Sequence, residues 1–249
     1  MKEKLYQLME TLKFRGMTKA ADQILRKAEK EGLPTGEALC ALLLEEQKYR
    51  EETSLQNRLL KAKIPWDWTV QTFPFELQPG VNKTQIMDLA GLDFVQRADN
   101  LIFIGDPGVG KTGLAISLLR QAILSGYRGR FYNAQDLLDE LYASLADRTT
   151  PKLLKTLCSC DVLLIDELGY INLKSEQVNA FFKLMGERYG KKSTIITTNL
   201  DYCDWYDLFR RKSLVDALLD RLKHYCITIR INGLSLRAPQ QDRPGNSTH

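Results

Sequence analysis

Residues 101–112 read LIFIGDPGVGKT, a short apolar run followed by a glycine-rich turn, a lysine and a threonine. The stretch fits the pattern G-x-x-x-x-G-K-[ST] and stands where that pattern has a physical meaning, after a predicted strand and at the start of a predicted helix. Its glycines let backbone N–H groups wrap phosphates, and the helix N-terminus adds partial positive charge. This context predicts a phosphate-binding loop rather than an accidental glycine-rich turn. The expected nucleotide contacts are Gly105, Asp106, Pro107, Gly108, Val109, Gly110, Lys111, Thr112 and Gly113.

The side chains that would act on the phosphates come from the loop and from a second motif. We expect Lys111 to reach the β and γ phosphates and Thr112 to offer its hydroxyl to Mg²⁺. Residues 162–167 read VLLIDE, an apolar run that ends in two carboxylates. Asp166 is expected to hold Mg²⁺, partly through water, and Glu167 to polarise the water that attacks the γ phosphorus. The second carboxylate favours hydrolysis over phosphoryl transfer to a small molecule. The alternative is that the two carboxylates are an exposed pair that only caps a helix.

Apolar runs alternate with helical segments beyond residue 80. Strands are expected at residues 101–104, 130–132, 162–165, 194–197 and 227–231. Helices are expected at residues 111–124, 176–189 and 214–223, with two more between 136 and 157. Continuous apolar strands separated by helices predict an α/β fold with a parallel sheet covered on both faces. The motifs are similar to those of the additional-strand group of phosphate-loop ATPases, in which a polar residue after this strand helps to position the attacking water. This resemblance makes Asn199, just after the fourth strand, the candidate for that role.

The first 64 residues predict a small all-α domain, because apolar residues recur at three- and four-residue spacings. Basic residues outside the apolar stripes are candidate contacts to DNA: Lys13, Arg15, Lys19, Arg50, Arg58, Lys61 and Lys63. Acidic residues are interleaved with them, so a solvated helical face is an equally good interpretation. The sequence leaves both readings open.

A segment rich in proline and aromatic residues separates this region from the rest. Residues 65–80 predict a linker, followed by a second domain at 81–237. We expect the aromatic residues of the linker to pack on the second domain, and lining an adenine pocket is the alternative; they are Trp66, Trp68, Phe73 and Phe75. Residues 238–249 are polar and predict a disordered tail.

The composition narrows the chemistry. The chain has 249 residues, of which 44% are hydrophobic and 27% charged, and a formal net charge of +4. Five cysteines without a C-x-x-C pair encode neither a disulfide framework nor a zinc cluster, and two histidines leave carboxylates, lysine, arginine and backbone to carry catalysis. No apolar run approaches the ~20 residues of a membrane span. The charged N-terminus lacks the apolar core of a signal sequence, which predicts a cytoplasmic protein without a membrane partner.

Taken in order along the chain, these motifs resemble those of AAA+ ATPases of the DnaC/IstB clade. They comprise the phosphate loop, residues 164–170, residues 197–199 and residues 220–222. Three further segments are similar to the IstB-like helper ATPases of transposition: LKFRGM at 12–17, RLLKAKIP at 58–65 and GLSLR at 233–237. The similarity runs from about residue 5 to residue 237. One departure is Gly113, where relatives usually carry histidine, and we expect this change to alter helix packing rather than phosphate contacts.

This resemblance implies a function and further site residues. Its members bind ATP between subunits of a homo-oligomer, assemble on double-stranded DNA with little sequence preference, and stimulate a separate transposase. Arg221 would act as a finger in the site of the adjacent subunit, with Arg210 and Arg211 as rivals, and Arg237 resembles the arginine of a second sensor. Residues 136–157, an extra helical element in this clade, would join the all-α domain in contacting DNA phosphates.

Two other functions stay open at this stage. A replicative helicase loader of the DnaC type shares the core motifs, although the cysteine-rich zinc domain of some loaders is absent from the sequence. A small-molecule kinase is disfavoured by the Asp166–Glu167 pair and by the separate helical region. Because the net charge is only +4, we expect DNA contact to be spread over many subunits, each with a modestly basic face.

Overall fold

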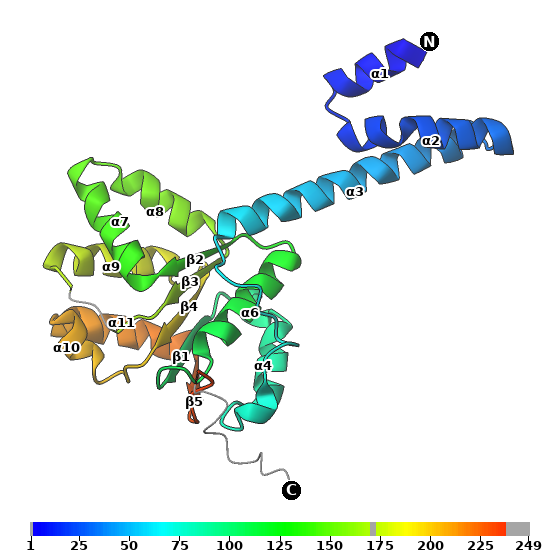
Figure 1. The fold of residues 1–249 in the computed structure, drawn as a ribbon. Coiled ribbons are helices and arrows are strands. Elements are labelled where there is room, and N and C mark those ends of the chain that lie inside the picture. The colour runs from blue at the N-terminus through cyan, green and yellow to red at the C-terminus, as the bar shows by residue number, and fades with distance from the viewer. Residues whose placement is uncertain (1, 170–172, 238–249) are drawn as a thin grey trace, which may run out of the picture. The chain divides into compact units, whose positions relative to one another are not determined.

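The computed structural model describes residues 2–169 and 173–237. The chain divides into two compact units, Met1–Arg58 and Leu59–His249 (Figure 1). The tail expected to be disordered, 238–249, lies outside the described residues. None of the helices in the described part combines the length and the apolar character that crossing a membrane requires. The domain boundaries drawn from the sequence stay predictions.

The first unit is helical. It contains α1 (Lys2–Thr11), α2 (Arg15–Glu31) and most of α3 (Thr35–Ala62). Methionine, alanine and leucine side chains from all three helices form its small core: Met9, Met17, Ala21 and Leu42.

A buried carboxylate fixes two of these helices together. Glu46 of α3 is only 5% exposed, and it accepts hydrogen bonds from the backbone N–H groups of Gly16 (2.7 Å) and Met17 (3.1 Å). These N–H groups stand in the first turn of α2, where a helix leaves donors unsatisfied and carries partial positive charge. Glu46 therefore caps α2 from the neighbouring helix.

The second unit is built on a five-stranded sheet in the order β2-β3-β4-β1-β5, with every pairing parallel. The strands are β1 (Asn100–Gly105), β2 (Gly129–Asn133), β3 (Val162–Asp166), β4 (Ser193–Thr198) and β5 (Cys226–Ile231). Every residue of β3 and β4 is buried. In β3 this burial matches the continuous apolar run Val162–Ile165, whereas β4 has two isoleucines between buried serine and threonine residues. The α/β fold with a parallel sheet is confirmed.

Helices cover both faces of the sheet (Figure 1). One face packs on helices that share its hydrophobic core: α7 (Ala134–Ala146), α8 (Thr150–Ser159), α9 (Ser175–Arg188), α10 (Trp205–Phe209) and α11 (Lys212–His224). The other face carries α6 (Lys111–Leu124), with α4 (Lys83–Ala90) and the short α5 (Asp93–Gln96) preceding β1. Because parallel strands end at the same edge, the segments after β1, β3 and β4 meet there.

Residues 65–80 belong to the packed structure of the second unit. Val70 and Phe73 are each 3% exposed, and Phe75–Leu77 form a single 3-10 turn, η1. The Gln78 side chain is fully buried, and its Nε2 donates to the carbonyl oxygens of Val109 and Leu234, both at 3.0 Å. This segment therefore supports the loop between β1 and α6.

Candidate nucleotide-binding site

The loop between β1 and α6 is held in one shape by its glycines. Gly108 and Gly110 have φ angles of 86° and 101°, in the left-handed region that favours glycine. A Cβ at Gly108 would lie 2.1 Å from Ser235 Oγ, and one at Gly110 would lie 2.7 Å from the Phe73 ring. Any larger residue at either position would push the loop away from its supports.

Lys111, at the start of α6, folds back over this loop. Its Nζ donates to the carbonyl oxygens of Gly105 and Asp106, both at 2.8 Å. Partial burial lowers the pKa of Lys111, while the Asp166 carboxylate opposes that shift. A cation that donates to carbonyl oxygens within a phosphate loop is suited to bind phosphate oxygens instead.

Thr112 and Asp166 meet at the base of the loop. Thr112 Oγ1 donates to Asp166 Oδ1 at 2.8 Å, and Thr197 Oγ1 donates to the same oxygen at 2.5 Å. Asp166 is 4% exposed, and burial raises its pKa, although both threonine hydrogen bonds act in the opposite direction. A hydroxyl beside a carboxylate is a hard-oxygen donor set, and it fits the preference of Mg²⁺ for few protein ligands plus water and phosphate.

Glu167 is exposed beside this pair and has a positive φ of 61°. Its backbone N–H donates to Thr197 Oγ1 at 2.9 Å, so a single threonine hydroxyl joins the two acidic residues. Asp166 thus points into the interior, while Glu167 lines the pocket. Two neighbouring carboxylates in such different surroundings are suited to different tasks.

Asn133 restrains the Glu167 side chain. Its Nδ2 donates to Glu167 Oε2 at 3.3 Å, while its Oδ1 accepts from the backbone N–H of Gln135 at 3.0 Å. Asn133 is the N-cap of α7. One amide therefore connects the start of that helix with the Glu167 carboxylate.

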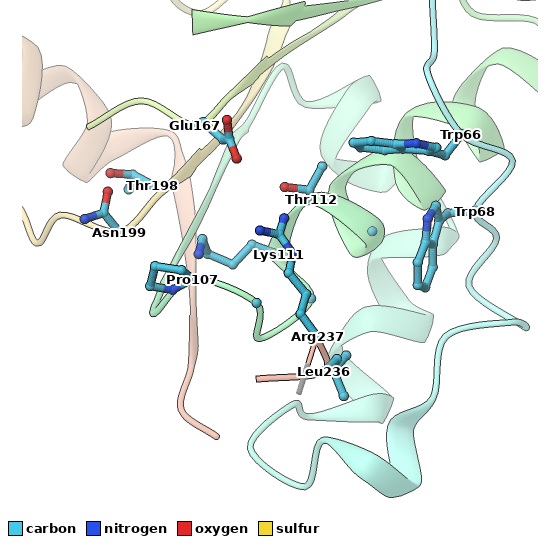
Figure 2. A pocket seen from close by; sticks show the side chains of 13 residues that line it. Trp66, Trp68, Pro107, Lys111, Thr112, Glu167, Thr198, Asn199, Leu236 and Arg237 are labelled. Carbon is cyan, nitrogen blue, oxygen red and sulfur yellow. The ribbon is translucent and has the colours of Figure 1, made fainter. Parts of the chain in front are cut away.

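The pocket above the loop has a volume of about 380 Å³, within the range of small-molecule sites. Figure 2 shows Glu167, Thr198 and Asn199 to one side of Lys111 and the tryptophans 66 and 68 to the other. The predicted residues that line it are Pro107, Gly108, Gly110, Lys111, Thr112, Gly113, Glu167, Asn199 and Arg237.

Arg237 reaches this pocket at the end of the segment that follows β5, residues 232–237, which we call the strap. The backbone N–H of Leu236 donates to the Gly108 carbonyl at 2.8 Å, and that of Arg237 donates to Ser235 Oγ at 3.2 Å. The strap is thereby tied to the phosphate loop itself. Arg237 adds positive charge to the pocket, which contributes to the lowered pKa of Lys111.

Four other residues predicted to contact the nucleotide lie next to the pocket but do not line it. Val109 is 1% exposed, so only its backbone could meet a nucleotide. Gly105 and Asp106 present carbonyl oxygens to Lys111, and Asp166 lies beneath Thr112.

The three arginines considered as trans fingers do not line this pocket. Arg221 is exposed on α11, with its guanidinium 5.8 Å from the centre of the Tyr189 ring. Arg210 and Arg211 are exposed before α11. Placement outside the pocket of the same chain is what a finger for a neighbouring subunit requires, and that role stays a prediction.

The candidate DNA contacts lie at the surface of the helices, and Arg58 is half-buried among them. In the first unit, Arg50 pairs with Glu46 (Nε to Oε1, 2.7 Å) and lies over the Phe14 ring, and Lys19 lies over the Tyr49 ring. Lys13 and Arg15 flank the turn before α2, whereas Lys61 and Lys63 lie in the second unit. These residues are accessible, but part of their charge is already paired.

Several residues of the site were not predicted from the sequence. Asn133 follows the second strand, and the strand-end rule that selected Asn199 could have selected it. Thr197 belongs to the motif at residues 197–199, but the sequence does not indicate that its hydroxyl contacts both acidic residues. No local sequence pattern indicates the role of Gln78, because its contacts to the loop and to the strap involve residues far away in the sequence.

The sheet order, the phosphate loop after β1, the paired carboxylates after β3 and the polar residue after β4 together define a nucleotide-binding domain of the AAA+ class. The model of the family described as IstB-like ATP binding protein matches residues 7–243. The chain belongs to this family.

Two relatives match this chain over almost its full length. A candidate ATP-binding protein of insertion sequence IS21 from Pseudomonas aeruginosa is 36% identical over 96% of this chain and 90% of its own length. A counterpart from insertion sequence IS5376 of Geobacillus stearothermophilus is 32% identical over 95% of this chain and 94% of its own. Among solved structures, the DnaC helicase loader is similar with a TM-score of 0.57 and 27% identity, over 69% of this chain and 100% of that one.

Proposed function

We propose that this protein is an ATP-hydrolysing, DNA-binding regulator that oligomerises on duplex DNA and assists a transposase in insertion-sequence transposition. The end-to-end similarity to ATP-binding proteins of insertion sequences supports the transposition setting. One observation carries the hydrolytic activity: Glu167 lines the pocket, while its neighbour Asp166 is buried against Thr112 and Thr197. The site thus has one carboxylate for a metal and another for water.

The geometry supports a separate role for each residue in phosphate binding, metal binding and hydrolysis. Lys111 exchanges the carbonyl oxygens of the loop for the β and γ phosphates. Thr112 and Asp166 would hold Mg²⁺, Asp166 partly through water. The metal, when bound, neutralises charge on the phosphates. Glu167 accepts a proton from the attacking water, which Asn199 helps to position. Arg237 from the same chain and Arg221 from a neighbouring subunit stabilise the charge that develops on the transferred phosphoryl.

Asn133 keeps this reaction slow in the isolated subunit. Its amide holds one oxygen of the Glu167 carboxylate, so this side chain is restrained from turning toward the attacking water. Because the same side chain caps α7, a movement of α7 would break this hydrogen bond and free Glu167. We propose that assembly on DNA causes such a movement. Hydrolysis is thereby linked to the assembled state.

The transposition role is favoured over that of a helicase loader. The relatives from IS21 and IS5376 are 36% and 32% identical and match along nearly the whole chain, whereas the similarity to the DnaC structure covers 69% of it. DNA contact through basic helical faces predicts affinity that falls steeply with salt.

A pair of substitutions tests this function. Lys111→Ala is expected to abolish ATP binding, whereas Glu167→Gln is expected to bind ATP with unchanged affinity, hydrolyse it at least about 100-fold more slowly and stay on duplex DNA. Binding is measured by calorimetry, hydrolysis by phosphate release, and DNA retention by filter binding at several salt concentrations. Hydrolysis by Glu167→Gln at the original rate would refute the assignment of the base, and a flat salt dependence would refute contact through phosphates.

A further inference from the structure

Two tryptophans at one end of the pocket have no role in the proposed phosphate binding or hydrolysis. Trp66 and Trp68 line the cavity on the side away from Glu167 and Asn199 (Figure 2). Trp66 is 54% exposed. A large aromatic ring that is half exposed at the wall of a concave site offers apolar surface to a ligand.

The phosphate loop determines which part of a nucleotide reaches these rings. Glu167 marks the γ-phosphate end, and the backbone N–H groups of the loop hold the α and β phosphates. The nucleoside therefore leaves the loop on the other side, next to Gly113, the residue after Thr112. Trp68 lies at this point, because a Cβ on Gly113 would be only 3.2 Å from Trp68 Cε3.

Two contacts fix Trp68 and its neighbour Asp67 on the second unit. The ring centres of Trp68 and Phe73 are 6.5 Å apart, and Phe73 is buried against the loop at Gly110. Asp67, between the two tryptophans, pairs with Arg120 of α6 (Oδ1 to Nη1, 2.5 Å). Glycine at 113 leaves the space that Trp68 occupies.

We infer that Trp66 and Trp68 form a stacking platform for the base of the bound nucleotide. This inference rests on the proposed ATP site. The described residues at this end, Trp66, Trp68, Gly113 and Leu236, present flat or apolar surface, which binds the π-face of a base and is tolerant of its identity. ATP and GTP therefore bind with affinities within about three-fold of each other, and a triphosphate without a base binds about ten-fold more weakly than ATP.

The test compares ATP with inorganic tripolyphosphate by calorimetry on the full chain. Trp66→Ala is expected to weaken ATP binding about ten-fold and to leave tripolyphosphate binding unchanged, while Trp66→Phe retains ATP affinity within about three-fold. Leu77→Ala is the matched control, because it removes an exposed apolar side chain of the same segment that does not line the pocket. Unchanged ATP affinity in Trp66→Ala, or an equal loss for both ligands, would overturn the platform.

A second measurement needs no substitution. Acrylamide quenches exposed tryptophan fluorescence, and Trp205, which is fully buried, should contribute little to that quenching. ATP is expected to protect the wild-type protein from acrylamide, whereas tripolyphosphate is not; equal quenching with and without ATP would contradict the platform. If the wild type binds neither ligand, the proposed nucleotide site itself fails, which is a different result from tight ATP binding without protection.

Discussion

Asn133→Ser separates the two tasks of this side chain. Serine is a good N-cap, so the hydrogen bond to the Gln135 N–H at the start of α7 can be kept. The shorter side chain cannot reach Glu167, whose Oε2 lies 3.3 Å from Asn133 Nδ2. A hydrogen bond to a charged group is worth more than a neutral one, but this bond is long and exposed, so we assign it about 1 kcal/mol. Its loss should raise DNA-independent hydrolysis about five-fold.

The assay is phosphate release at saturating ATP and Mg²⁺, without DNA. Asn133→Ala is the comparison variant: it loses both hydrogen bonds, so it should show the same increase in rate and about 1 kcal/mol lower stability. A rate for Asn133→Ser equal to that of the wild type would show that the amide does not restrain Glu167. A lower rate would show that the amide places the carboxylate productively, and either result would refute the proposed restraint.

Further predictions concern the trans arginine, a surface ion pair and the joining threonine. Arg221→Ala should keep ATP binding and lose hydrolysis, and mixing it with Lys111→Ala subunits should restore phosphate release; no recovery would argue against action in trans. Burial alone would raise the pKa of Asp161. The hydrogen bond from Lys192 acts in the opposite direction and helps to hold that pKa at about 2, below the ordinary 3.8. The ionised carboxylate therefore stabilises the fold above pH 3.8, and this stabilisation is lost as the pH falls towards 2. Asp161→Asn should lower the unfolding free energy at pH 7 by about 1–2 kcal/mol after allowance for solvent screening. Urea unfolding measures this difference between variant and wild type, and a difference that does not shrink in acid would contradict the prediction. Thr197→Val should reduce hydrolysis more than ATP affinity, because it leaves both acidic residues without their shared hydroxyl; equal losses in the two assays would contradict this role.

The sheet was predictable from the sequence because burial imposes a simple pattern on it. Every residue of β3 is buried, and the strand reads as a continuous apolar run before its carboxylate. The helix after the phosphate loop was predicted with its observed bounds, Lys111–Leu124, because the loop sets its start and its apolar residues pack on the sheet. The rule that parallel strands end at one edge then brought the two motifs together.

Long-range contacts set the parts that could not be predicted. The helices α4 and α10 are short, and Trp205 of α10 is buried through packing with Phe209 and Tyr202 rather than through a periodic stripe. Residues 65–80 read as a linker because of their prolines and aromatics. Burial of Gln78 and Phe73 there depends on a loop and a strap that follow much later in the chain.

The most direct test of the account is electron microscopy of the wild-type protein with duplex DNA, in ATP with Mg²⁺ and in ADP. ATP-bound subunits are expected to form multi-subunit assemblies along duplex DNA of unrelated sequences, and these should be absent in ADP. Subunits that stay unassembled in ATP, or that assemble only on single-stranded DNA, would contradict the account, and the second result would favour a helicase loader.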